Sequence, residues 1–191
     1  MRNRQAWAQM ARTAQRGFTL IEMMVAVALT ALLLSMAVPA LDIFVSNARQ
    51  TGAINDFVST IHQARSTAVT TNTRVTICPS SNGTNCEAVG WNNGWIVFSD
   101  HNSNQLIDGT DAIVTSSTEV RGLTMQSGEF GLAMQYRPNG RVTNAGANGN
   151  SGQFTVCDER GASYAKVVIV DLSGRPRLSK KMADGGDPDC V

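Results

Sequence analysis

The chain has 191 residues, which is enough for one ordinary domain and too few for two large ones. Its composition is 42% apolar, 6% aromatic and 16% charged, with a formal net charge of +1. This near-neutral balance excludes a uniformly basic nucleic-acid binder and an acidic disordered chain. The charge is unevenly placed, because residues 1–17 hold four arginines and no acid and so carry +4, while the remainder carries −3.

Residues 18–41 are the first predicted element, a membrane-spanning helix. These 24 residues contain Glu22 as their only ionisable side chain. At about 1.5 Å per residue they reach ~36 Å, enough to cross a hydrocarbon core of roughly 30 Å. A buried core helix is the alternative, but a charge-free run after an arginine-rich leader favours a span with its N-terminus in the cytoplasm. No A-x-A cleavage site follows the apolar run, so the sequence predicts a retained anchor.

The junction between the leader and the span is the most specific motif in the chain. It reads Arg16-Gly17-Phe18-Thr19-Leu20-Ile21-Glu22. This order resembles the class III signal of type IV prepilins and of type II secretion pseudopilins. The resemblance implies that a prepilin peptidase cuts between Gly17 and Phe18 and methylates Phe18. It also implies a single-pass protein of the inner membrane whose head, the part of the chain after the span, lies in the periplasm.

Glu22 is a functional candidate on physical grounds as well. A carboxylate inside an apolar helix costs roughly 2.5–3.5 kcal/mol on insertion scales. Cleavage after Gly17 would create a cation at matching depth, the α-amino group of Phe18 on a neighbouring subunit. Pairing would offset the desolvation of the carboxylate and fix the stagger of packed helices. The alternative is that Glu22 reaches to the membrane interface, and the family resemblance favours the assembly role.

Residues 42–72 are predicted to continue the helix into the head. Pro39 is expected to kink it, since proline removes a backbone donor and crowds the preceding turn. Asn72 is expected to end it. In between, apolar residues recur at three- and four-residue spacing and form one stripe of an amphipathic helix, the face on which a sheet packs: Ile54, Phe57, Val58, Ile61, Ala64, Ala68 and Val69.

Residues 73–191 change to short strands separated by turn signals such as Asn82-Gly83 and Asp108-Gly109. The polar stretch 144–152 is predicted to be a loop. A long helix followed by an antiparallel sheet indicates an α+β fold. The predicted strands are Arg74–Cys78, Trp95–Ser99, Ala112–Thr115, Phe130–Tyr136, Gln153–Cys157, Lys166–Asp171 and Arg175–Leu178.

The head resembles the GspH/FimT family of type IV minor pilins and type II secretion pseudopilins, in a FimT/FimU-like form. The similar segments occur in order and cover most of residues 17–178: Ala64–Val69, Val75–Ser80, Gly94–Phe98, Arg137–Arg141 and Ser173–Arg177. The resemblance implies a type IV pilin-like fold, with a long N-terminal helix packed on an antiparallel β-sheet head. It also implies assembly with other pilins or pseudopilins.

The four cysteines lie in the head, where an extracytoplasmic location permits disulfides. Four cysteines allow three pairings, and the sequence does not choose among them. Proximity favours Cys78–Cys86, which leaves Cys157–Cys190 to tether the C-terminal tail, as the FimU-like resemblance also suggests. A zinc site is the rival, but the chain lacks C-x-x-C and Cys/His spacing.

The loop 100–111 is a candidate calcium site. Its oxygen-bearing side chains recur at alternate positions, which allows them to converge on one hard cation: Asp100, Asn102, Asn104, Asp108 and Asp111. Two features oppose it, because Gln105 replaces the glycine of the sharp bend and the last ligand is a short aspartate. Asx-rich hairpin turns explain the same composition without metal. No other cofactor is indicated.

The segment 174–181 is a candidate DNA-binding strip, with Arg175, Arg177, Lys180 and Lys181 close together. It resembles the G-R-x-R motif of FimT-type minor pilins, which implies DNA binding in natural transformation. Arginine forks suit phosphates, and two arginines two apart on a strand would share a face. Three aspartates follow closely, and a basic edge strand is also a common protection against edge pairing.

Together these features predict a structural subunit, a minor pilin or pseudopilin, with a DNA-binding minor pilin as the alternative. The paired cysteines and basic motif favour the FimT/FimU-like form. Catalysis is disfavoured, because the chain has no G-x-S-x-G, H-E-x-x-H or phosphate-loop motif, and neither His62 nor His101 is near a nucleophile motif.

Overall fold

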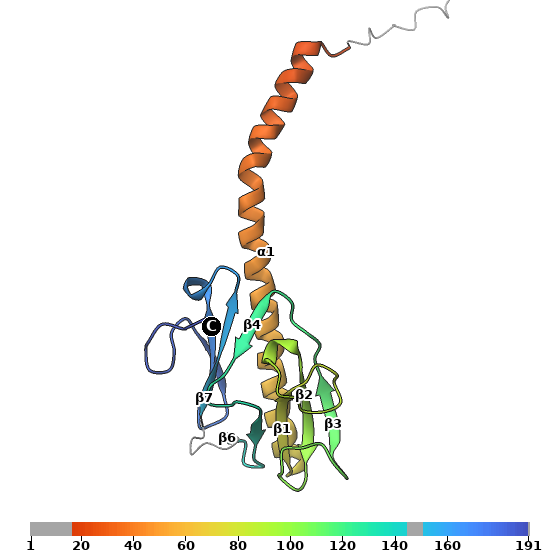
Figure 1. Cartoon of the computed structure of the whole chain (residues 1–191), viewed down its shortest axis with the longest axis vertical. Coiled ribbons are helices and arrows are strands. Elements are labelled where there is room, and N and C mark those ends of the chain that lie inside the picture. Colours follow the sequence, from red (N-terminus) through yellow and green to blue (C-terminus); the bar gives the residue numbers. More distant parts are fainter. Residues whose placement is uncertain (1–16, 145–150, 191) are drawn as a thin grey trace, which may run out of the picture. The chain divides into compact units, whose positions relative to one another are not determined.

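The computed structural model describes residues 17–144 and 151–190 (Figure 1). The leader predicted over residues 1–17 and the loop predicted over 144–152 therefore fall largely outside the described residues. The chain divides into two compact units, Met1–Phe44 and Val45–Val191. The second unit is the head.

Helix α1 runs from Leu20 to Thr71, and the backbone stays helical through position 39. It ends where predicted, because Asn72 has a left-handed φ of 53°, a conformation that asparagine tolerates better than most residues. Within the head, most of the predicted apolar stripe is buried. The fully or nearly fully buried members are Ile54, Phe57, Ile61, Ala64 and Ala68, joined by Ala53.

Nine short strands form two antiparallel sheets in the described residues, where the sequence suggested one. The five-stranded sheet has the order β3-β2-β1-β5-β6 and the four-stranded sheet β4-β7-β8-β9 (Figure 1). The first comprises β1 (Arg74–Pro79), β2 (Trp95–Asp100), β3 (Ala112–Ser116), β5 (Met134–Tyr136) and β6 (Val142–Asn144). The second comprises β4 (Leu123–Gln126), β7 (Gly152–Asp158), β8 (Lys166–Val170) and β9 (Pro176–Ser179). Two single-turn 3₁₀ helices, η1 (Trp91–Asn93) and η2 (Ala162–Tyr164), lie in the connections.

Six of the seven predicted strands are present within one or two residues of their expected ends. The strand predicted over Phe130–Tyr136 is shorter and begins at Met134. Phe130 instead lies in a turn, in which its carbonyl accepts from the amide of Ala133 at 2.9 Å, and its ring stacks on Phe154 inside the core. Strands β4 and β6 were not predicted.

The core of the head is centred on Phe57, which projects from α1 and is fully buried. Its ring makes edge contacts with Trp95 of the first sheet, at 5.0 Å between centroids, and with Phe154 of the second, at 4.7 Å. Trp91 of η1 lies 5.8 Å away in the same geometry. One helix residue therefore joins both sheets, with aromatic pairs that contribute beyond the burial of area alone.

A second, smaller core covers the other face of the five-stranded sheet. Because side chains alternate along a strand, Val75 and Ile77 of β1 belong to the main core while Cys78 belongs to the smaller one. The smaller core also contains Ile96, Phe98 and Ala133, with Cys86 and Ile107 packed against them. The disulfide loop and the Asx-rich loop 100–111 therefore cover the same sheet face.

Candidate functional site

The processing junction lies outside the helix. Gly17, Phe18 and Thr19 are exposed and non-helical, and the first helical residue is Leu20. Phe18 has 79% of its surface exposed. The peptide bond between Gly17 and Phe18, the predicted cleavage site, is therefore in an accessible backbone segment directly before the apolar helix.

Glu22 and Thr19 cap the start of α1 reciprocally. The amide of Glu22 donates to Thr19 Oγ1 at 3.2 Å, and the amide of Thr19 donates to Glu22 Oε2 at 3.5 Å. This is a capping box, which satisfies two of the free amides at a helix N-terminus. The T-x-x-E spacing was a signal that our sequence analysis missed. Glu22 thus has a partner within its own chain in addition to its predicted role in assembly.

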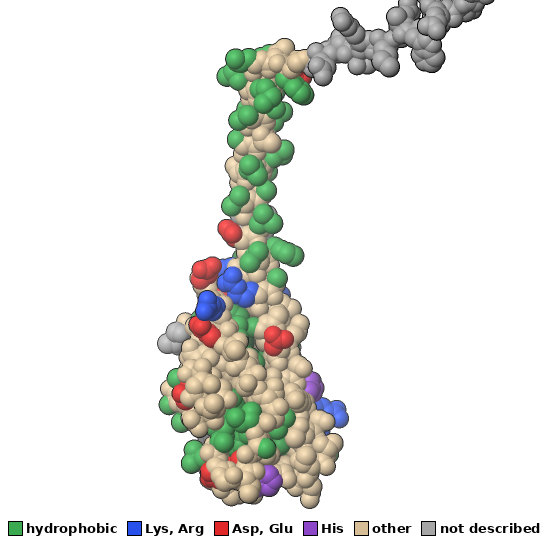
Figure 2. Space-filling model, turned by 90° about the vertical axis from the view of Figure 1, so that its right-hand side faces the viewer, with side chains coloured by type: hydrophobic (Ala, Val, Ile, Leu, Met, Phe, Trp, Pro, Cys, Tyr) green, Lys and Arg blue, Asp and Glu red, His purple; other side chains and the backbone are tan. Residues whose placement is uncertain are grey.

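The N-terminal part of α1 exposes an apolar surface on all sides, and Figure 2 shows its hydrophobic side chains from one direction. Within the described residues, Leu20–Thr71 is the one helix long and apolar enough to cross a membrane. At least half of each large apolar side chain in its first unit is exposed: Leu20, Ile21, Met23, Met24, Val25, Val27, Leu29, Leu32, Leu33, Leu34, Met36, Val38, Leu41, Ile43 and Phe44. An exposed apolar surface of this extent marks a contact with lipid or with other proteins.

The two hydroxyl groups within this apolar stretch are satisfied inside the helix. Thr30 donates to the carbonyls of Ala26 and Val27, at 2.5 and 3.1 Å, and Ser35 donates to that of Leu32 at 2.7 Å. Neither hydroxyl therefore needs water, which suits a helix surrounded by hydrocarbon or by apolar partners.

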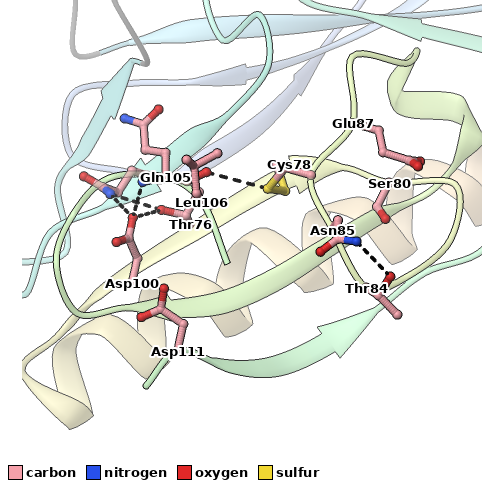
Figure 3. Close-up of a disulfide and its surroundings, with 12 residues drawn as sticks. Thr76, Cys78, Ser80, Thr84, Asn85, Glu87, Asp100, Gln105, Leu106 and Asp111 are labelled. Atoms are coloured by element: carbon pink, nitrogen blue, oxygen red, sulfur yellow. Dashed lines mark hydrogen bonds between the residues drawn. A yellow bond between two sulfur atoms is a disulfide. The ribbon is translucent and has the colours of Figure 1, made fainter. Parts of the chain in front are cut away.

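All four cysteines form disulfides, in the pairing that proximity favoured. Cys78 joins Cys86, with 5.5 Å between Cα atoms, and Cys157 joins Cys190, with 5.9 Å. The first closes the loop over the smaller core, next to Gln105 (Figure 3). The second ties the tail to β7, and the tail is further held where the Gln126 side chain donates to the carbonyl of Asp189 at 3.2 Å.

The disulfide loop is also held by Glu87. Its carboxylate accepts from the amide and hydroxyl of Ser81, at 2.7 and 2.5 Å, and from the side chain of Asn82 at 2.9 Å. These hydrogen bonds, from the Ser81 hydroxyl first, lower the pKa of Glu87 below its ordinary value. The loop is thus ordered by its own polar groups as well as by the crosslink.

The predicted calcium ligands make hydrogen bonds within the protein. Asp100 is fully buried and accepts from the side chains of Thr76 and Gln135, at 2.9 and 2.7 Å, and from the amide of Gln105 at 3.0 Å (Figure 3). Asp108 accepts from the side-chain amides of Asn102 and Asn104, at 3.0 and 2.5 Å.

Asp111 is the last predicted calcium ligand, and it accepts from the amides of His101 and Asp108, at 3.0 and 3.3 Å. Burial alone would raise the pKa of Asp111, but these hydrogen bonds outweigh it and lower the pKa. In the described part of the chain, no three side chains among His, Cys, Asp and Glu are placed to share a metal ion. Asn102 and Asn104 form Asx turns, because their side-chain oxygens accept from the amides of Asn104 and Leu106, at 3.2 and 2.8 Å. Calcium binding stays a prediction of the spacing alone.

The four cations of the predicted DNA strip lie in β9 and in the residues on either side of it. Arg177 lies in β9, an edge strand, and Arg175 directly precedes this strand. Lys181 follows the strand and pairs with Asp187 at 2.6 Å. Arg175, Arg177 and Lys180 are exposed. DNA binding by this strip stays a prediction of the family resemblance.

The fold instead brings Arg175 next to a second arginine-containing turn. The hydroxyl of Tyr136 donates to the carbonyl of Gly174 at 2.9 Å, and a Cβ placed on Gly174 would lie 2.4 Å from the carbonyl oxygen of Gly140. The turn that joins β5 to β6 carries Arg137 and Arg141, both exposed. Burial raises the pKa of Tyr136, so it stays a neutral hydrogen-bond donor.

A third cluster, missed in the sequence, fixes η2 to α1. Arg160 donates to both carboxylate oxygens of Asp158 and to the side chain of Asn47 at 3.0 Å, and it lies over the ring of Tyr164. The hydrogen bonds from Arg160 lower the pKa of Asp158 despite its burial. The Asp-x-Arg spacing carries no clear signal by itself, because Arg160 also binds Asn47 of α1, a residue more than 100 positions away.

Comparison with known proteins agrees with this arrangement. The family model described as type II transport protein GspH matches residues 53–174, and that of the prokaryotic N-terminal methylation motif matches residues 12–38. No curated protein matches the chain.

Among solved structures, the type IV minor pilin FimU of Pseudomonas aeruginosa PAO1 is similar in two crystal forms. The first has a TM-score of 0.54 at 18% identity over 71% of this chain and 92% of FimU, and the second has 0.51 at 17% over 68% and 91%. The minor pseudopilin EpsH of the Vibrio cholerae type 2 secretion system has 0.48 at 11%, over 69% and 96%. The match of the GspH model to most of the chain, together with the methylation motif, decides the assignment: the chain belongs to the GspH family of minor pilins and pseudopilins.

Proposed function

We propose that this chain is a minor structural subunit of a periplasmic filament, assembled after prepilin peptidase has removed residues 1–17 and methylated Phe18. The supporting observation is the surface of α1: directly after an accessible junction, its large apolar side chains are exposed on every side. Such a helix is stable in lipid before assembly and among neighbouring helices afterwards. The arginine-rich leader supports an orientation with the head outside the cytoplasm.

Glu22 would then have two successive roles. Before assembly, its carboxylate caps α1 through Thr19, as the hydrogen bonds indicate. In the filament, the carboxylate would accept the α-amino group of Phe18 from a neighbouring subunit, which offsets its desolvation. Both tasks require a negatively charged or at least hydrogen-bonding side chain at position 22.

The test follows the full-length chain in cells that contain the assembly machinery. Mass spectrometry of the membrane-bound protein should give an N-terminus at a methylated Phe18, and sheared filaments should contain the chain. A Gly17→Val variant should keep its leader and stay in the membrane fraction. A wild-type chain that still begins at Met1, or that is absent from every filament, would refute the proposal.

The phenotype of a gene deletion would distinguish between the two machines that could use the subunit. Deletion of the gene, scored separately for twitching, DNA uptake and enzyme export, distinguishes a type IV pilus from a type II secretion pseudopilus. The similarity to FimU in fold supports the pilus, and the name of the family model supports secretion. DNA binding stays a prediction from the G-R-x-R resemblance, since the described contacts do not favour DNA over another anion.

A further inference from the structure

We propose that a pocket under the C-terminal tail, residues 180–190, binds an alkylammonium or guanidinium group. The pocket has a volume of about 400 Å³ and lies between β7, the tail and the turn that follows β4. Such a volume is within the range of sites for small organic ligands, about 300–1,000 Å³. Thr155 lines it from β7, Glu129 from the turn, and Met182 and Asp189 from the tail.

Three attachments hold the tail over β7 and so build the pocket. The first is the disulfide that joins position 190 to β7. In the second, the side chain of Gln126, at the end of β4, donates to the carbonyl of Asp189 at 3.2 Å. In the third, the amide of Ala183 donates to Oε1 of Gln153, in β7, at 2.8 Å. The walls are therefore fixed before a ligand arrives, so that little conformational freedom is lost on binding.

Thr155 presents to this pocket a hydroxyl that has no partner in the head. Because side chains alternate along a strand, Phe154 and Val156 enter the main core while Thr155 lies on the opposite face, under the tail. Only 7% of Thr155 is exposed, and its hydroxyl makes no hydrogen bond with another described residue. Buried polar groups are almost always hydrogen-bonded, so this hydroxyl indicates a ligand that supplies the missing partner.

The charged groups that line the pocket are carboxylates. The side chain of Asp189 makes no hydrogen bond or ion pair with another described residue. Glu129 accepts only from the amide and the side chain of Gln153, both at 3.4 Å. No Lys or Arg is among the lining residues, and the neighbouring Lys181 is paired with Asp187 at 2.6 Å. Two carboxylates at one pocket repel each other, so the pocket selects a cation and rejects phosphates and carboxylates.

The size of the pocket favours an organic cation over a metal ion. Calcium ligands converge to about 2.3–2.6 Å from the ion, which a space of about 400 Å³ does not provide. In the part of the chain that the structure describes, no three His, Cys, Asp or Glu side chains are placed to share a metal. Met182 instead offers an apolar wall to a carbon chain. The oxygen atoms of Thr155, Glu129 and Asp189 suit the several N–H donors of an ammonium or a guanidinium group.

Isothermal titration calorimetry of the full-length chain in detergent tests the site with two probes, cadaverine and agmatine. Both should bind saturably to the wild type. Asp189→Asn should weaken binding by about tenfold and Thr155→Val by about fivefold, because the first loses a charged acceptor and the second a neutral one. The melting temperatures of both variants should stay close to that of the wild type, since neither side chain has a partner within the head.

Two matched controls separate position from charge and from crosslinking in general. Asp184→Asn makes the same change in charge within the tail, outside the pocket, and keeps the acceptor of the local hydrogen bond, so it should bind as the wild type does. Cys157→Ser/Cys190→Ser releases one wall and should abolish binding. Cys78→Ser/Cys86→Ser removes the other crosslink and should leave the affinity unchanged.

The bound cation can belong to a free polyamine or to a lysine or arginine of another protein chain, and crosslinking in cells separates these sources. A photo-crosslinking amino acid replaces Gly128, which lines the pocket and has open space where a side chain would begin. An adduct with a second chain, through a peptide that contains Lys or Arg, would assign the cation to a protein partner. Absence of an adduct, together with binding of cadaverine, would assign it to a free amine.

Three results of the titration would overturn the site. They are no binding of either amine to the wild type, equal affinities for the wild type and for Asp189→Asn, and an equal loss in Asp184→Asn, which would indicate a general effect of charge. Binding of calcium but of neither amine, lost in Asp189→Asn, would show a metal site instead. The titration uses the purified chain, so its outcome is independent of whether the chain assembles into a filament.

Discussion

Phe57 is the residue on which the head depends most. It is fully buried and touches Trp91, Trp95 and Phe154, which come from three different elements. Phe57→Ala should lower the free energy of unfolding by about 3–5 kcal/mol, because it removes apolar contacts and leaves a cavity. Thermal unfolding in detergent measures this. Val69→Ala is the control, since Val69 is 48% exposed on the same helix and should cost under ~0.5 kcal/mol.

Asp158 gives the head a pH-dependent contribution to its stability. Its pKa is lowered in the folded state by Arg160, while an unfolded aspartate titrates near about 3.9. The carboxylate therefore stabilises the fold at pH values above about 4, and this contribution is lost as the pH falls toward the folded pKa.

Asp158→Asn should remove that dependence and cost about 1.5–3 kcal/mol at pH 7, because Arg160 loses a charged hydrogen-bond acceptor. Unfolding measured between pH 3 and 7 should show a shallower slope for the variant than for the wild type. Equal slopes would show that other carboxylates control acid unfolding.

Asp100 attaches the loop 100–111 to the five-stranded sheet. The carboxylate accepts four hydrogen bonds, two of them from β1 and β5, so it anchors the loop over the smaller core. Asp100→Asn would turn some of these acceptors into donors and should destabilise the head by about 1–3 kcal/mol. Because amide groups already occupy the carboxylates, the melting temperature should be the same in excess calcium and in chelator. A rise of several degrees with calcium would favour the metal site.

The tail is held to β7 mainly by its disulfide. Closing loops of about 8 and 33 residues contributes roughly 3 and 4 kcal/mol in the chain-entropy model, so Cys157–Cys190 should matter at least as much as Cys78–Cys86. Cys157→Ser/Cys190→Ser should release residues 180–190 and make the bond after Lys180 or Lys181 sensitive to trypsin. Cys78→Ser/Cys86→Ser, the matched control, should leave those bonds protected.

Elements with a strong local signal were predictable, and those defined by distant contacts were not. The helix followed from its period and Asn72, and the longer strands from their apolar runs. Strand β4 has only four residues and pairs with β7 about 30 positions later, so its sequence alone carries little information. The same reason explains the division into two sheets, which depends on the strand order and on Phe57 between them.

The residues of the candidate site also divide into those predictable from the local sequence and those defined by distant contacts. The predictions for the junction and Glu22 come from a contiguous motif, which the methylation-motif model also matches, and the disulfides were predicted from proximity along the chain. The hydrogen-bond donors of Asp100 were not predictable, because oxygen atoms at alternate positions suit a cation and an Asx turn equally. Its donors, Thr76 and Gln135, lie 24 and 35 positions away. The contact between Arg65 and Gly140 could not be predicted for the same reason, since the two residues are 75 positions apart.

At the scale of the whole molecule, assembly should depend on the chemistry at position 22. Glu22→Ala removes the cap and also the proposed partner of the α-amino group, so the variant should be processed but largely absent from sheared filaments. Glu22→Gln keeps a hydrogen-bonding side chain without the charge and should assemble to an intermediate extent. Immunoblots of membrane and filament fractions measure both. Normal incorporation of Glu22→Ala would show that the carboxylate has no role in assembly.

Both crosslinks lie between residues 78 and 190, and the predicted cleavage point follows residue 17. Thiol oxidation and proteolytic maturation thus act on separate stretches of polypeptide and need no fixed order. A host without its periplasmic dithiol oxidase should accumulate subunits that are correctly trimmed at one end and vulnerable to degradation at the other. Quality control of the chain would then act on the reduced head, whether or not the leader has been removed.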